Sequence, residues 1–243
     1  MSQTASAEVH AEAHDHAHGH ATPTPPGFVP HHVAHHFKTW EQEFQSGKLG
    51  FWLFLATEIL LFGGLFAAYI YYHGIYPETF AVCGSLLSWK LGALNTCVLL
   101  LSSWTMAMAV RAAQLSQRKA CFNWLMITVA CGAVFMVVKY FEYSAKIEHG
   151  TLPTAWFHPH GEEAALLATV PHPSMFFSIY FTMTGIHGLH VLIGMIVISW
   201  YAVGVAKGRY HSGHYLPIDL VGLYWHIVDI IWIFLFPLLY LVP

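Results

Sequence analysis

The chain has 243 residues and a formal net charge of −3, and only 9% of its residues are charged whereas 56% are hydrophobic. A soluble domain carries about 25% charged residues, so this composition excludes an ordinary soluble enzyme and indicates a protein of the lipid bilayer. The apolar residues stand in long runs, without the alternation of an outer-membrane barrel. No basic patch with interleaved aromatic residues is present, so nucleic acid is not an expected partner.

Residues 1–46 are predicted to form a disordered, His-rich tail. Nine of the 19 histidines lie there, in two clusters at 13–20 and 31–37 and one isolated position. The tail has almost no aliphatic run that a fold could bury, so we expect it to stay disordered. Its histidines are able to bind Zn²⁺, Ni²⁺ or Cu²⁺, but a solvated polar tail with incidental metal affinity is the preferred interpretation.

Residues 47–243 are predicted to form a five-span membrane domain. About 20 apolar residues are needed to cross the hydrocarbon core, and five stretches of that length follow the tail. We expect the spans at about residues 49–72, 91–112, 122–145, 173–206 and 218–241. The fold class is therefore all-α, an integral membrane bundle of five helices.

The distribution of lysine and arginine predicts how this bundle is oriented. One side of the membrane would carry Lys38, Lys48, Arg111, Arg118, Lys119, Lys207 and Arg209, and the other only Lys90 and Lys146 at span ends. Basic residues gather on the cytoplasmic side, so the N-terminus should be cytoplasmic and the C-terminus periplasmic. We expect a multi-pass protein of the bacterial plasma membrane.

Five polar side chains on three spans fall at a similar depth in the membrane. They are Glu58 on the first span, His187 and His190 on the fourth, and His226 and Asp229 on the fifth. Each of the last two pairs has i, i+3 spacing and shares one helix face. We therefore expect the fourth and fifth helices to pack with these pairs facing each other, with Asp229 accepting a hydrogen bond from a histidine.

Glycines accompany these histidines on the fourth span, at Gly185, Gly188 and Gly194. Glycine in a membrane helix lets another backbone approach closely, so we expect a neighbouring helix to pack there. On the third span, Lys139 and Glu142 have i, i+3 spacing near the outer end. This spacing predicts a local ion pair.

Several interpretations of the mid-membrane groups stay open on spacing alone. Three imidazoles and a carboxylate, His187, His190, His226 and Asp229, are a possible ligand set for zinc, iron or copper. Two of the histidines are candidate axial haem ligands. Glu58 with the other groups is a candidate proton relay. The structural alternative is a set of interhelical hydrogen bonds that holds the bundle together.

Five segments, one in each span and in this order, resemble subunit III of the haem–copper oxidases. They are ATEILLF (56–62), LNTCVLLLSS (94–103), KYFEYS (139–144), GIHGLHVLIG (185–194) and YWHIVDIIWIFLFPLLY (224–240). The resemblance covers about residues 45–243. Mitochondrial members of this family have seven spans, so the five expected here resemble the bacterial form. The two absent spans form one wall of the family's lipid cleft.

The resemblance implies an accessory subunit of a respiratory terminal oxidase that reduces O₂ to water and translocates protons. This chain would bind no cofactor and would not be catalytic alone, since haem and copper would lie in the partner subunits. The implied partners are subunit I, which this chain would stabilise, subunit II and membrane lipids. Cytochrome c is the preferred electron donor. A quinol oxidase subunit and a nitric oxide reductase-associated homologue are the alternatives, and a membrane metal- or haem-binding protein is the alternative from another class.

The resemblance also suggests roles for the polar residues. It implies that His187, His190, His226 and Asp229 make interhelical hydrogen bonds. It identifies Glu58 with the family's buried carboxylate, which is associated with reactivity towards carbodiimides.

Overall fold

A computed structural model describes residues 25–29, 40–153 and 156–241 of the chain. These residues are mostly helical, and the β-pairing among them is limited to one isolated antiparallel bridge between Thr151 and Phe157. The prediction of an all-α membrane bundle is confirmed. Most of the expected tail (1–46) lies outside the described residues, so its disorder stays a prediction. Its last seven residues, 40–46, are part of the first helix.

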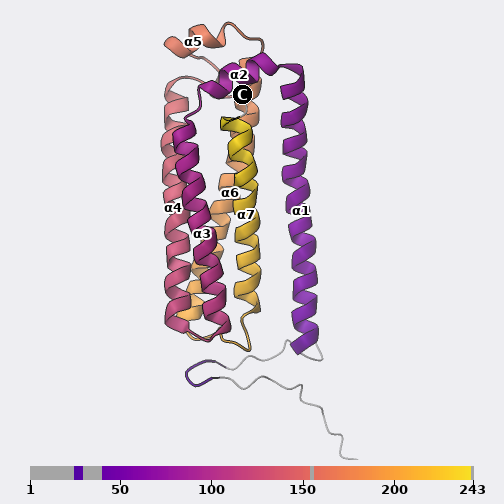
Figure 1. Cartoon of the computed structure of the whole chain (residues 1–243), viewed down its shortest axis with the longest axis vertical. Coiled ribbons are helices and arrows are strands. Elements are labelled where there is room, and N and C mark those ends of the chain that lie inside the picture. Colours follow the sequence, from indigo (N-terminus) through magenta and orange to yellow (C-terminus); the bar gives the residue numbers. More distant parts are fainter. Residues whose placement is uncertain (1–24, 30–39, 154–155, 242–243) are drawn as a thin grey trace, which may run out of the picture.

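Among the described residues, five long helices are apolar enough to cross a membrane. They are α1 (Trp40–Ile75), α3 (Trp89–Gln114), α4 (Arg118–Glu148), α6 (Pro173–Ala206) and α7 (Leu216–Tyr240). They run alternately up and down, so that the start of α1 and the end of α7 lie at opposite ends of the molecule (Figure 1). α1 begins well before the expected residue 49, because a helix continues past the hydrocarbon core into water, where hydropathy no longer marks its end.

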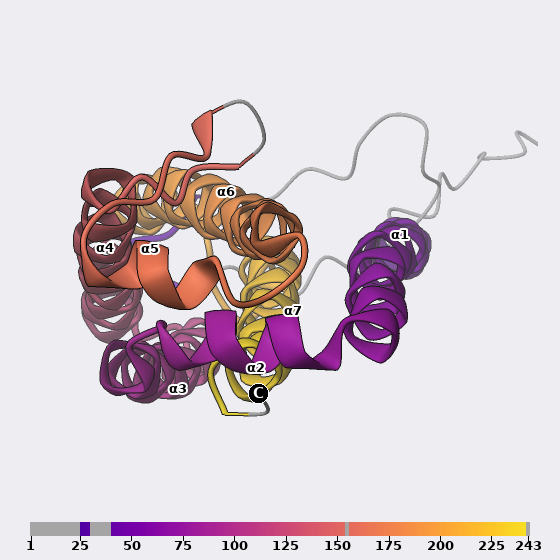
Figure 2. The ribbon, with the colours of Figure 1, turned by 90° about the horizontal axis from the view of Figure 1, so that it is seen from above.

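Two short helices lie across one end of the bundle, and hydropathy does not predict either of them. They are α2 (Pro77–Ser85), between the first two long helices, and α5 (Glu162–Leu167), in the connection before α6. In the end-on view α2 runs from α1 past the end of α7 towards α3 (Figure 2). α2 begins with Pro77 at a first helical position, where a missing N–H costs nothing.

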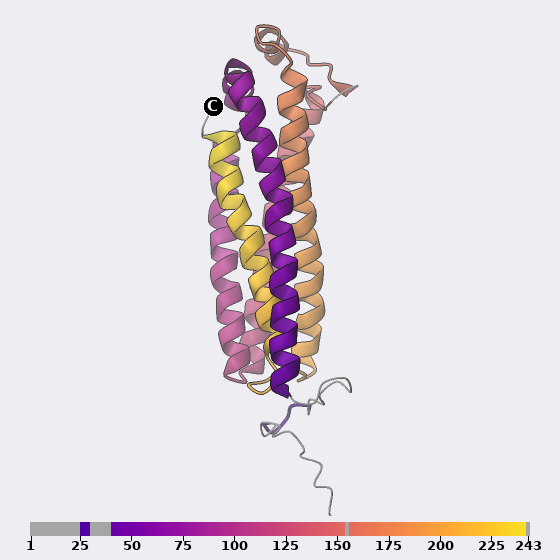
Figure 3. The ribbon, with the colours of Figure 1, turned by 90° about the vertical axis from the view of Figure 1, so that its right-hand side faces the viewer.

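α3, α4, α6 and α7 gather closely, whereas α1 stands at their side (Figure 2). The side view places α1 in front of α6 and α7 (Figure 3). In its most apolar stretch only 17% of the α1 residues are buried, compared with 44% in α7. α1 is therefore the helix with the largest share of its surface left for lipid or for another subunit.

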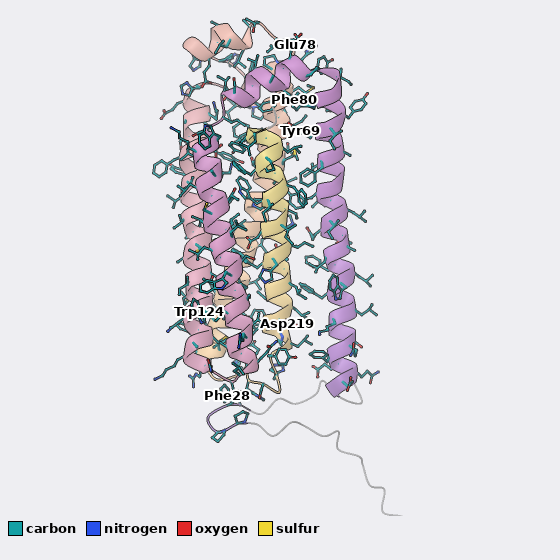
Figure 4. All side chains as sticks on the ribbon, viewed as in Figure 1. Phe28, Tyr69, Glu78, Phe80, Trp124 and Asp219 are labelled. Atoms are coloured by element: carbon teal, nitrogen blue, oxygen red, sulfur yellow. The ribbon has the colours of Figure 1, made fainter. Side chains whose placement is uncertain are left out.

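The four closely packed helices meet in an aromatic core. Trp225 and Trp232 of α7 are fully buried, and Phe135 of α4 packs edge-on against Trp232 with ring centroids 5.0 Å apart. At the end covered by α2, Tyr69 of α1 and Phe80 of α2 make a similar contact at 5.0 Å (Figure 4). The Tyr69 hydroxyl also donates to the Leu238 carbonyl at 2.6 Å, which ties α1 to the end of α7.

Candidate functional site: polar groups within the spans

Glu58 and His190 form a contact between α1 and α6. Glu58 Oε2 lies 2.7 Å from His190 Nε2, and His190 Nδ1 lies 2.7 Å from the Ile186 carbonyl oxygen. Because Nδ1 must carry a proton to donate to that carbonyl, a neutral ring has a bare Nε2 that accepts from a protonated carboxyl. The alternative is an imidazolium beside a carboxylate. The pair is neutral as a whole in both states, which suits its position inside the membrane.

An apolar cavity of about 360 Å³ opens beside this pair, between α1 and the helices α6 and α7. Glu58 and His190 line it together with aromatic residues that include Phe51, Phe54 and Tyr224. A larger cavity of about 650 Å³ lies between α1 and α7, and all of its lining residues are apolar, among them Phe62 and Phe234. Both cavities lie along α1 on the side that faces the bundle, and their mostly apolar lining suits a lipid acyl chain.

His226 and Asp229 contact α3. His226 Nδ1 lies 2.7 Å from the Ser103 hydroxyl oxygen, and Asp229 Oδ2 lies 3.5 Å from the Ser102 hydroxyl oxygen. The indole N–H of Trp225 also donates to Ser102 Oγ, at 3.0 Å. These contacts bind α7 to α3 at two successive serines of the resembling segment 94–103.

The expected single cluster of His187, His190, His226 and Asp229 is therefore replaced by separate contacts. His190 faces α1, and the two polar residues of α7 bond to α3. The physical reason is that aromatic rings fill the space between α6 and α7, with Trp225 packed on α6 at Gly194. Within residues 25–29, 40–153 and 156–241, no three His, Cys, Asp or Glu side chains gather in a way that suits a metal ion.

His187 is the candidate residue that lies deepest in the core. Its side chain is fully buried, and its ring lies 5.1 Å from the Trp232 ring and 5.5 Å from the Phe135 ring, between centroids. Neither ring nitrogen has a hydrogen-bond partner among the described residues, and the same holds for the buried side-chain amide of Asn95. Buried polar groups of this kind usually bind an ordered water molecule.

Lys139 and Glu142 lie at the centre of a network that joins three helices. Lys139 Nζ lies 2.9 Å from Glu142 Oε2 and donates to the Tyr240 hydroxyl at 2.7 Å. Glu142 Oε1 accepts from Tyr180 at 2.8 Å and from Tyr240 at 2.5 Å. The ammonium also lies 4.7 Å from the centroid of the Trp232 ring. What spacing alone predicts as a local ion pair thus connects α4 with α6 and α7.

The spacing of residues in the sequence does not predict that Tyr180 and Tyr240 belong to this network, because a tyrosine in an apolar helix is often only a packing residue. Nor does it predict the contacts of Lys146, which is 5% exposed although it lies near the end of α4. Its ammonium donates to the Leu86 carbonyl at 3.0 Å and lies 3.4 Å from Glu163 Oε1. Lys146 therefore connects α4 with the end of α2 and with α5.

Reactivity of Glu58 towards a hydrophobic carbodiimide stays a prediction, and the structure provides a reason to test it. Such a reagent partitions into the bilayer, and Glu58 lines an apolar cavity between α1 and two other helices. We expect labelling at Glu58, measured by mass spectrometry of peptides, and more than about 90% of it lost in Glu58→Gln. Glu78, on α2 outside the spans, serves as the matched control in Glu78→Gln. Equal labelling of the Glu58→Gln protein would contradict the prediction.

Long apolar helices joined by buried polar contacts define a polytopic α-helical membrane protein, and comparison with known proteins gives its family. The family model described as "Cytochrome c oxidase subunit III" matches residues 33–158 and 166–242. This chain belongs to that family, as a subunit III of a haem–copper terminal oxidase, a group that includes quinol oxidases. Other oxidase subunits are its partners.

Three curated relatives illustrate the range of the family. The "Cytochrome c oxidase subunit 3" of Thermostichus vulcanus is 32% identical over 198 residues, which cover 79% of this chain and 86% of that protein. The "Probable quinol oxidase subunit 3" of Staphylococcus saprophyticus is 29% identical over 215 residues, which cover 86% of this chain and 97% of that protein. The protein of the same name from Staphylococcus epidermidis is 28% identical over 213 residues.

Proposed function

We propose that this chain is an accessory subunit without redox cofactors, which stabilises subunit I of the oxidase and assembles with subunit II. The main support is that polar groups in its spans contact other helices of the chain itself. Glu58 contacts His190, Ser103 contacts His226, and the Lys139–Glu142 pair contacts Tyr240. Lipid offers no hydrophobic drive for helix association, so contacts of this kind help to hold a bundle together.

In this proposal, haem and copper belong to the partner subunits, and the chain alone is not catalytic. Its residues 40–153 and 156–241 form the surface on which the partners pack. The cavities along α1 are suited to lipid acyl chains, so membrane lipids are further partners. The complex as a whole reduces O₂ to water and moves protons outward.

Cytochrome c is the proposed electron donor of the complex. The relative named as a cytochrome c oxidase subunit shares 32% identity with this chain and supports that choice. A quinol is the second candidate, because a relative named as a probable quinol oxidase subunit aligns over 97% of its own length.

We further propose the bacterial plasma membrane as the location, with the N-terminus cytoplasmic and the C-terminus periplasmic. Arg111, Arg118, Lys119, Lys207 and Arg209 stand at the ends of α3, α4 and α6 or in the following connections, on the side of the bundle where α1 begins. Basic residues favour the cytoplasmic side, so this end of the bundle is assigned to the cytoplasm.

A phosphatase that is active only in the periplasm tests this orientation when it is fused after residue 243. We expect the fusion to be active, and a stable but inactive fusion would reverse the assignment.

The test of the accessory function is purification of the tagged chain from native membranes in mild detergent. We expect haem bands in the reduced-minus-oxidised spectrum of the eluate, and oxidation of ferrocytochrome c faster than that of ubiquinol. Harsher detergent should remove haem and copper together with the partner subunits and leave this chain colourless. Haem or stoichiometric metal that stays with the chain would overturn the proposal.

Asp229→Asn sharpens this test, because Asp229 is 3% exposed and contacts α3 through Ser102. We expect the variant to recover about half or less of the co-purifying oxidase, since one interhelical contact is weakened by about 1 kcal/mol. The haem content per recovered oxidase should be unchanged. A lower haem content at full recovery of the partner subunits would instead make Asp229 part of a cofactor site.

A further inference from the structure

Four basic side chains gather where α6 ends and α4 begins. Arg118 and Lys119 form the first turn of α4, and Lys207 and Arg209 follow α6 directly. Gly208 lies between the last two, with φ of +73°, and a Cβ atom built there would lie 3.6 Å from Arg118 Nη1. The Arg118 guanidinium thus packs beside the loop that carries Lys207 and Arg209, and all four cations stand at the same end of the bundle.

None of these four cations has an ion pair with a carboxylate in the part of the chain that the structure describes. All four side chains are exposed. Like charges gathered at one end of a bundle repel one another, and an anion placed between them reduces that repulsion. The cluster therefore has the charge pattern of an anion site, at the level where the spans end and lipid headgroups lie.

Two cavities flank the last turn of α6 beside these cations. One, of about 490 Å³, is lined by Arg118, Lys119, Phe122, Asn123 and Ala206. The other, of about 340 Å³, is lined by Trp200, Val203, Gly204, Lys207, Arg209 and Tyr210. In both, charged residues stand at the end of the span, and apolar or aromatic residues lie further into it. A free phosphate ion would use only the charged part, whereas a phospholipid uses both parts.

Two aromatic residues of the second cavity fit the same ligand. Trp200 is 73% exposed about a turn and a half before the end of α6, which is the usual position of an interfacial tryptophan. Burial raises the pKa of Tyr210, and Tyr201 adds to that effect. The Tyr210 phenol carries its proton at neutral pH, so its O–H is able to donate a hydrogen bond to a phosphate oxygen.

We propose that this surface binds an acidic phospholipid. Its phosphate would lie among Arg118, Lys119, Lys207 and Arg209, and its acyl chains would run along Phe122 and Trp200. This site is at the opposite end of the bundle from α2, and it is separate from the cavities along α1. It does not depend on which electron donor the oxidase uses.

The test is native mass spectrometry of the full chain, purified in mild detergent with its bound subunits and titrated with phosphatidylglycerol or phosphatidylcholine of identical acyl chains. We expect the unaltered protein to retain phosphatidylglycerol preferentially. Arg118→Gln/Lys119→Gln and Lys207→Gln/Arg209→Gln should each weaken that retention about 30-fold, the effect of two cations near an anionic headgroup. Lys48→Gln/Arg111→Gln removes the same charge at the same end but lines neither cavity, so it should change retention less than about 2-fold.

Each other outcome overturns the proposal. Equal retention of the two lipids would show that the net negative charge of the headgroup is not recognised. An equal loss in the control variant would reduce the effect to general surface charge. Unchanged retention of phosphatidylglycerol in both site variants, at an unchanged melting temperature, would show that these cavities are not the lipid-binding site. Inorganic phosphate competing as well as phosphatidylglycerol would make this a phosphate site, and cross-links from Phe122→Cys to another subunit that block lipid would make it a protein interface.

Discussion

Replacing Glu142 by leucine is expected to destabilise the bundle by about 3–5 kcal/mol, the cost of leaving one partner of a buried ion pair uncompensated. Lys139 is 6% exposed, and in Glu142→Leu its ammonium would keep only the Tyr240 hydroxyl and the surrounding rings. Tyr180 and Tyr240 would each lose the acceptor that joins them to α4. The measurement is thermal unfolding of the purified complex, followed through the release of this chain.

The control is the double variant Lys139→Met/Glu142→Leu, which removes both charges together. A buried ion pair often contributes little net stability compared with a well-packed apolar pair. The double variant should therefore regain most of the stability that Glu142→Leu loses. Tyr240→Phe removes one hydroxyl and should cost only about 1 kcal/mol. If the double variant were as unstable as Glu142→Leu, the cost would come from packing and not from an unpaired charge.

Gly194→Val is expected to destabilise the packing of α6 on α7 by about 1–3 kcal/mol, as overpacking of a filled core does. A Cβ atom at residue 194 would lie 2.9 Å from two ring carbons of Trp225. That ring is fully buried, and a Cβ atom at Gly132 on α4 would also approach it, to 3.1 Å, so it has little room to move. The loss should appear as a lower melting temperature and a lower yield of the assembled complex.

Gly188→Val is the matched control, on the same helix and in the same segment. A Cβ atom there would meet no atom beyond its own stretch of helix within 4 Å among the described residues, so the change should shift the melting temperature only slightly. A second variant, Gly194→Ala, adds the Cβ atom alone and should lie between the two. Equal effects of valine at residues 188 and 194 would show that β-branching in the helix, and not contact with Trp225, is responsible.

The helices could be predicted because hydropathy is a local property of the chain, and the expected span at 173–206 has the same bounds as α6. The hydrogen-bond partners of the polar groups could not be predicted, because those partners depend on how each helix is rotated about its axis. The i, i+3 spacing correctly places Lys139 and Glu142 in reach of each other. Tyr240, however, comes from 98 positions after Glu142 along the chain, and no local pattern links them.

The glycines of the fourth span show the same difference between what the local sequence predicts and what depends on distant residues. Of the three expected positions, Gly185, Gly188 and Gly194, only Gly194 has a close neighbour, and this neighbour is the Trp225 side chain instead of a backbone. That ring in turn explains why the polar residues of α6 and α7 do not face each other. A large side chain on one helix decides the partners of smaller ones on both, and this follows only from packing.

The loose attachment of α1 has a consequence for how the chain is made. Glu58 lies 132 residues ahead of His190, so α1 leaves the ribosome long before its partner exists. At about 5–20 residues per second, the interval is on the order of ten seconds. During that time a lone ionised carboxyl in mid-bilayer would cost about 2.5–3.5 kcal/mol on insertion scales. The apolar residues around Glu58 must hold the nascent helix in the membrane until α6 is synthesised, so membrane insertion and final packing of α1 are separate events.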